Sequence, residues 1–178
     1  MMIRKRNFRQ YLIELGFINF RQNALPAVLL GAFFCLIILG FFVVLQKYVL
    51  NIEQVQKVLN QWNIERKYVL SFMFMMIFTN SVCEEIYWRG YIFKKLTVKY
   101  SPFLVILLTS LFYASYHPIT IINLFPIIYG ILFTIVIFGI GVFWGYMRHK
   151  YDSIYFPVIS HLFADLGIML MYFKYFGS

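Results

Sequence analysis

Acidic and other charged residues are scarce in this sequence. Of 178 residues only seven are Asp or Glu, and Asp, Glu, Lys and Arg together make up 13%. A soluble globular chain has about 25% charged residues. With 62% hydrophobic residues, this chain lacks the polar side chains needed to cover a surface that faces water. The composition therefore excludes an ordinary soluble domain and predicts an integral membrane protein.

Cysteine is scarce as well, and its placement excludes two further classes. Cys35 and Cys83 both lie in apolar runs, so neither a disulfide nor a zinc knuckle is expected. The basic start Met1–Arg9 is not followed by a short apolar stretch that ends in small residues, so we expect no cleavable signal peptide. The net charge of +9 resides mostly at the ends of apolar runs, which is typical of loops beside anionic lipid headgroups. We therefore expect a lipid bilayer as a partner, and no nucleic acid.

Long apolar runs dominate the rest of the chain. A membrane-spanning helix needs about 20 apolar residues. The sequence predicts an all-α, polytopic transmembrane helix bundle of five spans, or six if the stretch after Pro118 is a separate element. The second span is expected to continue as far as Phe93. The five predicted segments are Ala24–Leu45, Tyr68–Trp88, Pro102–Tyr116, Ile127–Met147 and Ile154–Phe173.

The distribution of Lys and Arg predicts the orientation. If the N-terminus is cytoplasmic, ten of these residues lie in inner segments and five in outer ones, which agrees with the positive-inside rule. We expect a basic cytoplasmic segment at residues 1–23, a first transmembrane helix with an amphipathic loop at 24–67, and a core at 68–178. The inner residues are Arg4, Lys5, Arg6, Arg9, Arg21, Lys94, Lys95, Lys99, Arg148 and Lys150, and the outer ones are Lys47, Lys57, Arg66, Lys67 and Lys174.

Asn51–Lys67 is too polar to span a membrane. Its apolar residues Ile52, Val55, Leu59 and Trp62 recur at steps of three and four, which predicts one apolar stripe on a helix. Such a helix either lies in the membrane surface or packs on the bundle as an ordinary loop helix.

Two adjacent carboxylates and an arginine interrupt the second apolar run. Ionisable side chains at membrane depth cost several kcal/mol, roughly, so they usually face a cavity or a partner. Glu85 and Arg89 are four residues apart, which places them on one helical face and predicts an ion pair. Glu84 has no such partner in its helix. It is therefore the best candidate for a general base.

Two further pairs have the same spacing of four residues. These are Tyr113 with His117 and His161 with Asp165. Asp165 could fix the tautomer of His161 or share an anion-binding role with it. Each pair alone is compatible with a structural role, but the three sets together indicate one cavity between helices. Gly141 and Gly145 form a GxxxG pattern, which favours close packing of helices in membranes.

These motifs resemble those of the CAAX prenyl protease 2 family, also called CPBP intramembrane endopeptidases. That family has Glu-Glu-x-x-x-Arg, then Phe-x-x-x-His, then His-x-x-x-Asn or His-x-x-x-Asp. Here the motifs begin at Glu84, Tyr113 and His161, with tyrosine in place of the usual phenylalanine. The similarity covers roughly Tyr68–Tyr172.

The resemblance implies an enzyme, an intramembrane endopeptidase that cleaves a peptide or membrane-protein substrate. It implies that Glu84 and His117 activate a water, that His161 and Asp165 stabilise the oxyanion, and that Glu85 and Arg89 order the site. An aspartate stabilises an oxyanion only if it is protonated or if it orients His161.

No cofactor is expected, although a metal-dependent variant stays open. In that variant Glu84, His117 and His161 would be the ligands of a zinc ion that keeps an open position. The catalytic set that we predict is otherwise Glu84, His117, His161 and Asp165, with Glu85, Arg89 and Tyr113 as organising or substrate-binding residues.

Two other functions stay open. The small size favours a bacteriocin self-immunity or peptide-maturation protein of the same family. Polar groups among apolar helices are also compatible with a small transporter or channel, which would need no cleavage. The Lys, Asn, Ile and Phe content suggests a bacterium, and hence its cytoplasmic membrane. The substrate and the oligomeric state do not follow from the sequence.

Overall fold

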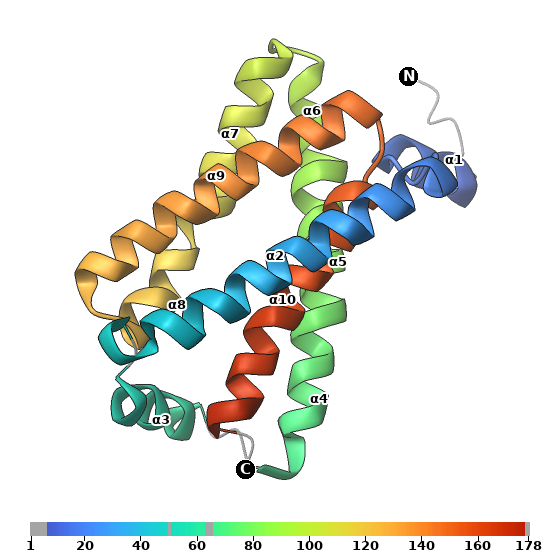
Figure 1. The fold of residues 1–178 in the computed structure, drawn as a ribbon. Coiled ribbons are helices and arrows are strands. Elements are labelled where there is room, and N and C mark those ends of the chain that lie inside the picture. Colours follow the sequence, from blue (N-terminus) through green and yellow to red (C-terminus); the bar gives the residue numbers. More distant parts are fainter. Residues whose placement is uncertain (1–6, 50, 63–65, 177–178) are drawn as a thin grey trace.

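The computed structural model describes residues 7–49, 51–62 and 66–176, and in these ranges the chain forms helices and no strand. The helices lie against one another as a bundle (Figure 1), which confirms the predicted all-α class. The elements are α1 (Phe8–Leu15), α2 (Phe20–Val49), α3 (Ile52–Gln61), η1 (Arg66–Tyr68), α4 (Val69–Phe74), η2 (Met75–Asn80), α5 (Ser81–Glu85), η3 (Ile86–Ile92), α6 (Phe93–Thr97), α7 (Pro102–Ser115), α8 (His117–Leu124), α9 (Ile127–Tyr151) and α10 (Tyr155–Phe176).

Four continuous helices are long and apolar enough to cross a membrane. Within the described ranges they are Phe20–Val44, Val69–Thr97, Ile127–Tyr151 and Tyr155–Tyr175. Helices α7 and α8 are bent by 42° and make a fifth span if they are counted together. The predicted count of five agrees with that reading, whereas the part of the chain that the structure describes contains no sixth span. Residues 119–124 do not form one because they belong to the short helix α8, which ends at Leu124.

The second span is longer than predicted and is not a uniform α-helix. It runs to Thr97, beyond the expected end at Phe93, because the apolar and helix-compatible residues continue through α6. Two π-helical stretches, η2 and η3, lie on either side of the five-residue α5, which carries the two glutamates. A π-helix has a wider turn and often occurs at functional sites. The unusual backbone thus lies where the sequence has its unusual charges.

Small residues bring the long helices close together. A Cβ atom on Gly31 of α2 would lie 2.8 Å from Phe163 Cβ of α10, and one on Gly167 would lie 3.2 Å from the Cys35 backbone. On the other side of the bundle, a Cβ on Gly145 of α9 would lie 3.2 Å from Ile106 Cγ2 of α7. Close backbone approach of this kind stabilises helix pairs where lipid removes the hydrophobic driving force.

Helix α3 packs on the bundle with part of the predicted stripe. Val55 of that stripe is buried and Leu59 is half-buried, while Ile52 and Trp62 at its ends are exposed. Val58, outside the stripe, is also buried. The helix contacts α8, where the Gln54 side-chain amide donates to the Asn123 carbonyl oxygen at 3.4 Å, which favours the loop-helix alternative. Residues 63–65 of the predicted segment lie outside the described residues.

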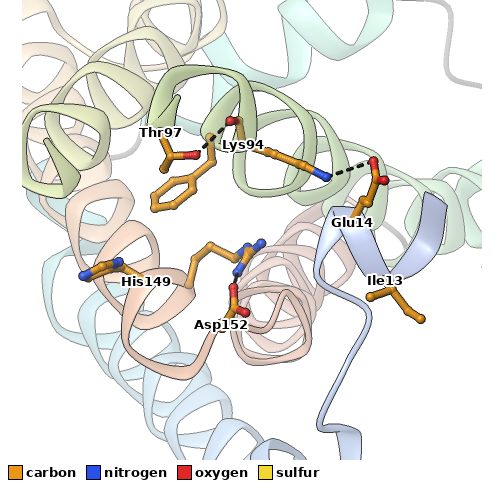
Figure 2. Close-up of a pocket in the computed structure, with 8 residues that line it drawn as sticks. Ile13, Glu14, Lys94, Thr97, His149 and Asp152 are labelled. Carbon is orange, nitrogen blue, oxygen red and sulfur yellow. Dashed lines mark hydrogen bonds and ion pairs between the residues drawn. The ribbon is translucent and has the colours of Figure 1, made fainter. Parts of the chain in front are cut away.

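The segments that we predict to be cytoplasmic meet at one end of the bundle. There α1, the end of α6 and the end of α9 lie near one another, opposite the end that carries α3 and α8 (Figure 1). A cavity of about 330 Å³ at this end is lined by charged side chains, among them Glu14, Lys94, Arg148 and Asp152 (Figure 2). Lys94 Nζ lies 2.9 Å from Glu14 Oε2. The orientation of this end in the membrane stays a prediction.

Candidate active site

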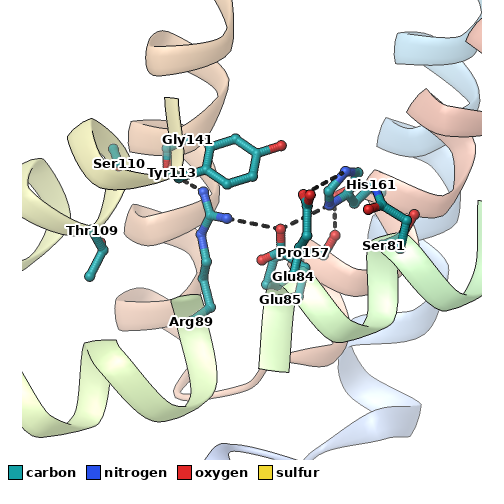
Figure 3. A network of polar contacts seen from close by, with 12 residues as sticks. Ser81, Glu84, Glu85, Arg89, Thr109, Ser110, Tyr113, Gly141, Pro157 and His161 are labelled. Atoms are coloured by element: carbon teal, nitrogen blue, oxygen red, sulfur yellow. Dashed lines mark hydrogen bonds and ion pairs between the residues drawn. The ribbon is translucent and has the colours of Figure 1, made fainter. Parts of the chain in front are cut away.

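Three parts of the bundle bring its polar side chains together. The second span supplies Glu84, Glu85 and Arg89, and α10 supplies His161, which lies opposite the two glutamates (Figure 3). Tyr113 comes from the end of α7. Residues far apart in the sequence thus converge inside an otherwise apolar bundle.

Glu85 and Arg89 form a fully buried ion pair. Arg89 Nη1 donates to Glu85 Oε1 at 2.9 Å, and neither side chain is exposed at all. The four-residue spacing on one helix allows this contact even though η3 is π-helical. Because pairing offsets much of the cost of removing both charges from water, the two residues depend on each other.

Arg89 also reaches across to α7 and α9. Its Nη2 donates to the Gly141 carbonyl oxygen at 3.1 Å. The guanidinium carbon lies 4.4 Å from the centre of the Tyr113 ring and 5.4 Å from that of the Trp144 ring. Such cation–π contacts gain strength where water is excluded. Gly141 is needed here because a Cβ would lie 3.3 Å from Arg89 Nη2, so the glycine pattern serves this contact as well as helix packing.

His161 contacts the predicted Asp165 but has a closer partner. Its Nδ1 donates to Glu85 Oε1 at 2.9 Å, whereas Asp165 Oδ1 lies 3.6 Å from Nε2, beyond hydrogen-bond distance. The ring also stacks on Trp144, with 4.4 Å between the ring centres. A carboxylate paired with Arg89 accepts hydrogen bonds, so it places a proton on Nδ1 of His161. Glu85 therefore takes the tautomer-fixing place that spacing alone had suggested for Asp165.

Asp165 is held from the second span by two residues that the motif pattern did not include. Ser81 Oγ lies 2.7 Å from Asp165 Oδ2, and Asn80 Nδ2 donates to the same oxygen at 3.4 Å. Ser81 Oγ is also 2.7 Å from the Ile77 carbonyl oxygen. The signal for Ser81 was present in the sequence, because it precedes Glu85 by four residues and so lies on the same helical face.

Glu84 has a different environment from its neighbour. Its Oε2 lies 3.8 Å from His161 Nε2, too far for a hydrogen bond. This oxygen is buried and has no hydrogen-bond partner among the described residues, and the same is true of the Tyr116 hydroxyl oxygen. The side chain as a whole is 17% exposed. Glu84 is thus a carboxylate that faces the His161 imidazole and the Tyr116 hydroxyl, without a hydrogen bond at Oε2.

His117 begins α8, directly after the bend that ends α7. Its Nδ1 lies 2.8 Å from the Tyr113 carbonyl oxygen, and its ring stacks on Tyr116 with 4.4 Å between centres. A carbonyl oxygen only accepts, so Nδ1 carries the proton and the neutral ring has its lone pair on Nε2. Among the described side chains, His117 makes no hydrogen bond or ion pair with Glu84. The two histidines share Tyr113, whose ring centre is 6.2 Å from that of His161.

The proposed zinc ligands do not assemble as a metal site. In the described ranges, no three His, Cys, Asp or Glu side chains come together so that they could hold one ion. Glu84, His117 and His161 are all among these residues. The Nδ1 atoms of both histidines are hydrogen-bonded, one to a carbonyl oxygen and one to Glu85, which leaves Nε2 as the ring nitrogen that could bind a metal. In this arrangement these two nitrogens and the Glu84 carboxylate are not grouped around one ion position.

The profile of a known family covers this whole site. The family described as type II CAAX prenyl endopeptidase Rce1-like matches residues 66–167, more than half of the chain, and this range contains Glu84 and Asp165. Comparison with curated proteins and with solved structures gives no match. With its four to five apolar helices the chain is an integral membrane protein. The sequence motifs, the buried constellation and the family profile agree, and the chain belongs to the type II CAAX prenyl endopeptidase Rce1-like family.

Proposed function

We propose that this protein is an intramembrane endopeptidase in which Glu84 and His117 activate a water molecule without a metal or other cofactor. The observation that supports the proposal is the difference between the two carboxylates: Glu84 Oε2 lies 3.8 Å from His161 Nε2 without a hydrogen bond, whereas Glu85 Oε1 accepts from both Arg89 and His161. General acid–base catalysis needs a group that is free to take a proton at the reacting atom. Family membership supports a protease, and the different environments of the two carboxylates support the assignment of Glu84 as the base.

In the proposed reaction the water oxygen attacks the carbonyl carbon of the scissile peptide bond. Glu84 takes one water proton, and the carbonyl oxygen becomes an oxyanion. The carbon–nitrogen bond then breaks, and the proton passes from Glu84 to the leaving amine. His117 supports this transfer through its Nε2 lone pair, which the bond from Nδ1 to the Tyr113 carbonyl leaves free.

The oxyanion is stabilised by His161 and Asp165 in this proposal. With Nδ1–H held by Glu85, a doubly protonated His161 donates its Nε2–H toward the reacting oxygen. Asp165 acts as a neutral carboxylic acid. Ser81 Oγ and Asn80 Nδ2 both donate to Asp165 Oδ2, so a proton on Asp165 would reside on Oδ1, the oxygen that lies 3.6 Å from His161 Nε2. From Oδ1 that proton can be donated to the reacting oxygen.

The test compares peptide termini in membranes and in secreted material from cells that make the wild type or Glu84→Gln at equal levels. Glu53→Gln is the matched control, because Glu53 is an exposed carboxylate on α3, far from the motifs in sequence. Termini that depend on Glu84 but not on Glu53 are the expected result, and they name the substrate. Cleavage retained in Glu84→Gln contradicts the proposal.

The cofactor-free part of the proposal has its own test. Purified protein in lipid vesicles is treated with EDTA and then dialysed, and cleavage of the identified substrate is measured. Unchanged cleavage is expected, because no three His, Cys, Asp or Glu side chains of the described ranges are grouped so that they could hold one ion. Activity that is lost with EDTA and restored by zinc contradicts it.

A further inference from the structure

Arg148 is a buried cation that belongs to none of the three motifs. It lies in the last turn of α9, and its side chain is only 7% exposed. The guanidinium is enclosed from several sides. A Cβ on Gly16, in the turn between α1 and α2, would lie 2.9 Å from its Cζ, and the Phe93 ring centre is 5.6 Å from Cζ. A buried arginine needs partners for its donors, so the groups that it binds reveal its role.

One partner is the main chain of Arg89. Arg148 Nε donates to the Arg89 carbonyl oxygen at 3.0 Å. In a regular α-helix this carbonyl would accept from the amide four residues later, that of Phe93. Here the Phe93 amide donates to the Trp88 and Gly90 carbonyls, because η3 is π-helical. Arg148 thus donates to a carbonyl oxygen that does not accept a hydrogen bond from the Phe93 amide.

The other partner of Arg148 is Asp152, and it lies at the surface. Arg148 Nη1 donates to Asp152 Oδ1 at 2.7 Å, but the Asp152 side chain is 81% exposed. An ion pair with so exposed a partner contributes little to stability. The contact with the Arg89 carbonyl is the buried one, and we take it to be the more important of the two.

We propose that Arg148 is a positioning residue, which fixes the π-helical backbone at Arg89 and through it the orientation of His161. The path consists of three contacts: Arg148 Nε to the Arg89 carbonyl, the Arg89 guanidinium to Glu85 Oε1, and Glu85 Oε1 to His161 Nδ1. Arg89 and His161 therefore depend on one backbone position. The catalytic consequence rests on the proposed function, whereas the effect on His161 does not.

The first test is independent of activity. The chain has three histidines, so ring ¹⁵N labels in detergent micelles give a small set of signals, which His117→Gln, His149→Gln and His161→Gln assign. In Arg148→Gln we expect the His161 ring signals to shift or broaden. Lys150→Gln is the matched control, because Lys150 is an exposed cation on the same helical turn with no contact to Arg89. Its His161 signals should match those of the wild type.

The second test uses the substrate found through Glu84. A misplacement of about 1 Å can cost about 100-fold in rate. We therefore expect Arg148→Gln to lower kcat by about 10- to 100-fold while KM changes by less than about threefold, with Lys150→Gln unchanged. If Glu84→Gln still cleaves, the proposed function fails, yet the histidine signals still decide the role of Arg148.

Arg148→Lys covers the case in which Arg148→Gln does not fold. Lysine keeps a cation opposite Asp152 but lacks the fixed Nε–H donor, so we expect the same change in the His161 signals. Unchanged His161 signals in a folded variant overturn the proposal. Loss of folded protein in both variants also overturns it, since Arg148 would then be structural alone.

Discussion

Glu84 and Glu85 are neighbours in the chain, but their surroundings differ. Glu85 is fully buried, and its Oε1 accepts from Arg89 and from His161 at 2.9 Å each. Glu84 is 17% exposed, and its Oε2, like the Oε2 of Glu85, has no hydrogen bond in the described part of the chain. Glu85 joins the second span to α10 through these contacts, whereas Glu84 is available for acid–base chemistry. The comparison shows that of two adjacent glutamates one can have a structural role while the other is available for chemistry.

The same contrast divides the two histidines. His161 is bound by Glu85 and stacked on Trp144, whereas His117, among the described residues, is held by the Tyr113 carbonyl oxygen of α7 and by the rings of Tyr113 and Tyr116. We expect His117→Ala and His161→Ala each to lower kcat/KM by about 100- to 10,000-fold, as for loss of an acid–base group. Only His161→Ala should also lower the temperature of unfolding in detergent micelles. Equal stability of the two variants would break the comparison.

Substitution of Arg89 tests how much the buried Glu85–Arg89 ion pair contributes to stability. Arg89→Leu leaves Glu85 buried without its cation, so we expect a loss of about 3–5 kcal/mol in the free energy of unfolding. In the double variant Glu85→Leu/Arg89→Leu the unpaired charge is gone, and the loss should be smaller than the sum of the two single losses. Denaturant unfolding in micelles measures all three variants. Simple additivity would show that the pair is not coupled.

Two glycines of α9 allow a test of how much the close approach of α9 to α7 contributes to stability. A Cβ on Gly141 would lie 3.2 Å from Ser110 Cβ and from Tyr113 Cδ1, while one on Gly139 would meet nothing within 4 Å. We expect Gly141→Ala to lower the free energy of unfolding by about 1–3 kcal/mol, a typical cost of overpacking. Gly139→Ala, two residues away, should leave it unchanged or slightly raised. A similar loss in both variants would assign the effect to the helix rather than to the contact.

The smallest effect is expected at Asp165. Asparagine is neutral and keeps a hydrogen-bond donor, so Asp165→Asn should change kcat/KM by about tenfold or less, the value of roughly one hydrogen bond. Asp165→Leu, which is of similar size but has no donor, should lose far more. Steady-state cleavage by both variants measures the difference. Equal loss in Asp165→Asn and Asp165→Leu would mean that Asp165 acts as a carboxylate.

Much of this arrangement is readable from the sequence because it depends on local spacing. The helical class and the Glu85–Arg89 contact follow from apolar runs and from a four-residue step on one helix. The contact from Glu85 to His161 was not predictable, because it joins residues 76 positions apart and depends on how α10 packs. The π-helical turns also escaped prediction. The residue types do not reveal that the backbone hydrogen bonds of these turns follow the π-helical pattern. In this pattern the Arg89 carbonyl oxygen accepts from Arg148.

Helix α3 shows the same limit on a smaller scale. Its residues predict an amphipathic helix, and the cap from Asn51 to the Gln54 amide at 3.0 Å agrees with that. Which stripe becomes buried depends on α8, against which α3 packs, so Val58 is buried and Trp62 is not. Local propensity determines the helix, whereas the tertiary partner determines its buried face.

The most direct test of the central claim compares Glu84→Gln with Glu85→Gln in the same lipid vesicles, with cleavage and unfolding measured on each. The account predicts that Glu84→Gln unfolds like the wild type but does not cleave, and that Glu85→Gln is clearly less stable because Arg89 loses its charged partner. Cleavage by Glu84→Gln, or wild-type stability of Glu85→Gln, would contradict the division of roles between the two carboxylates.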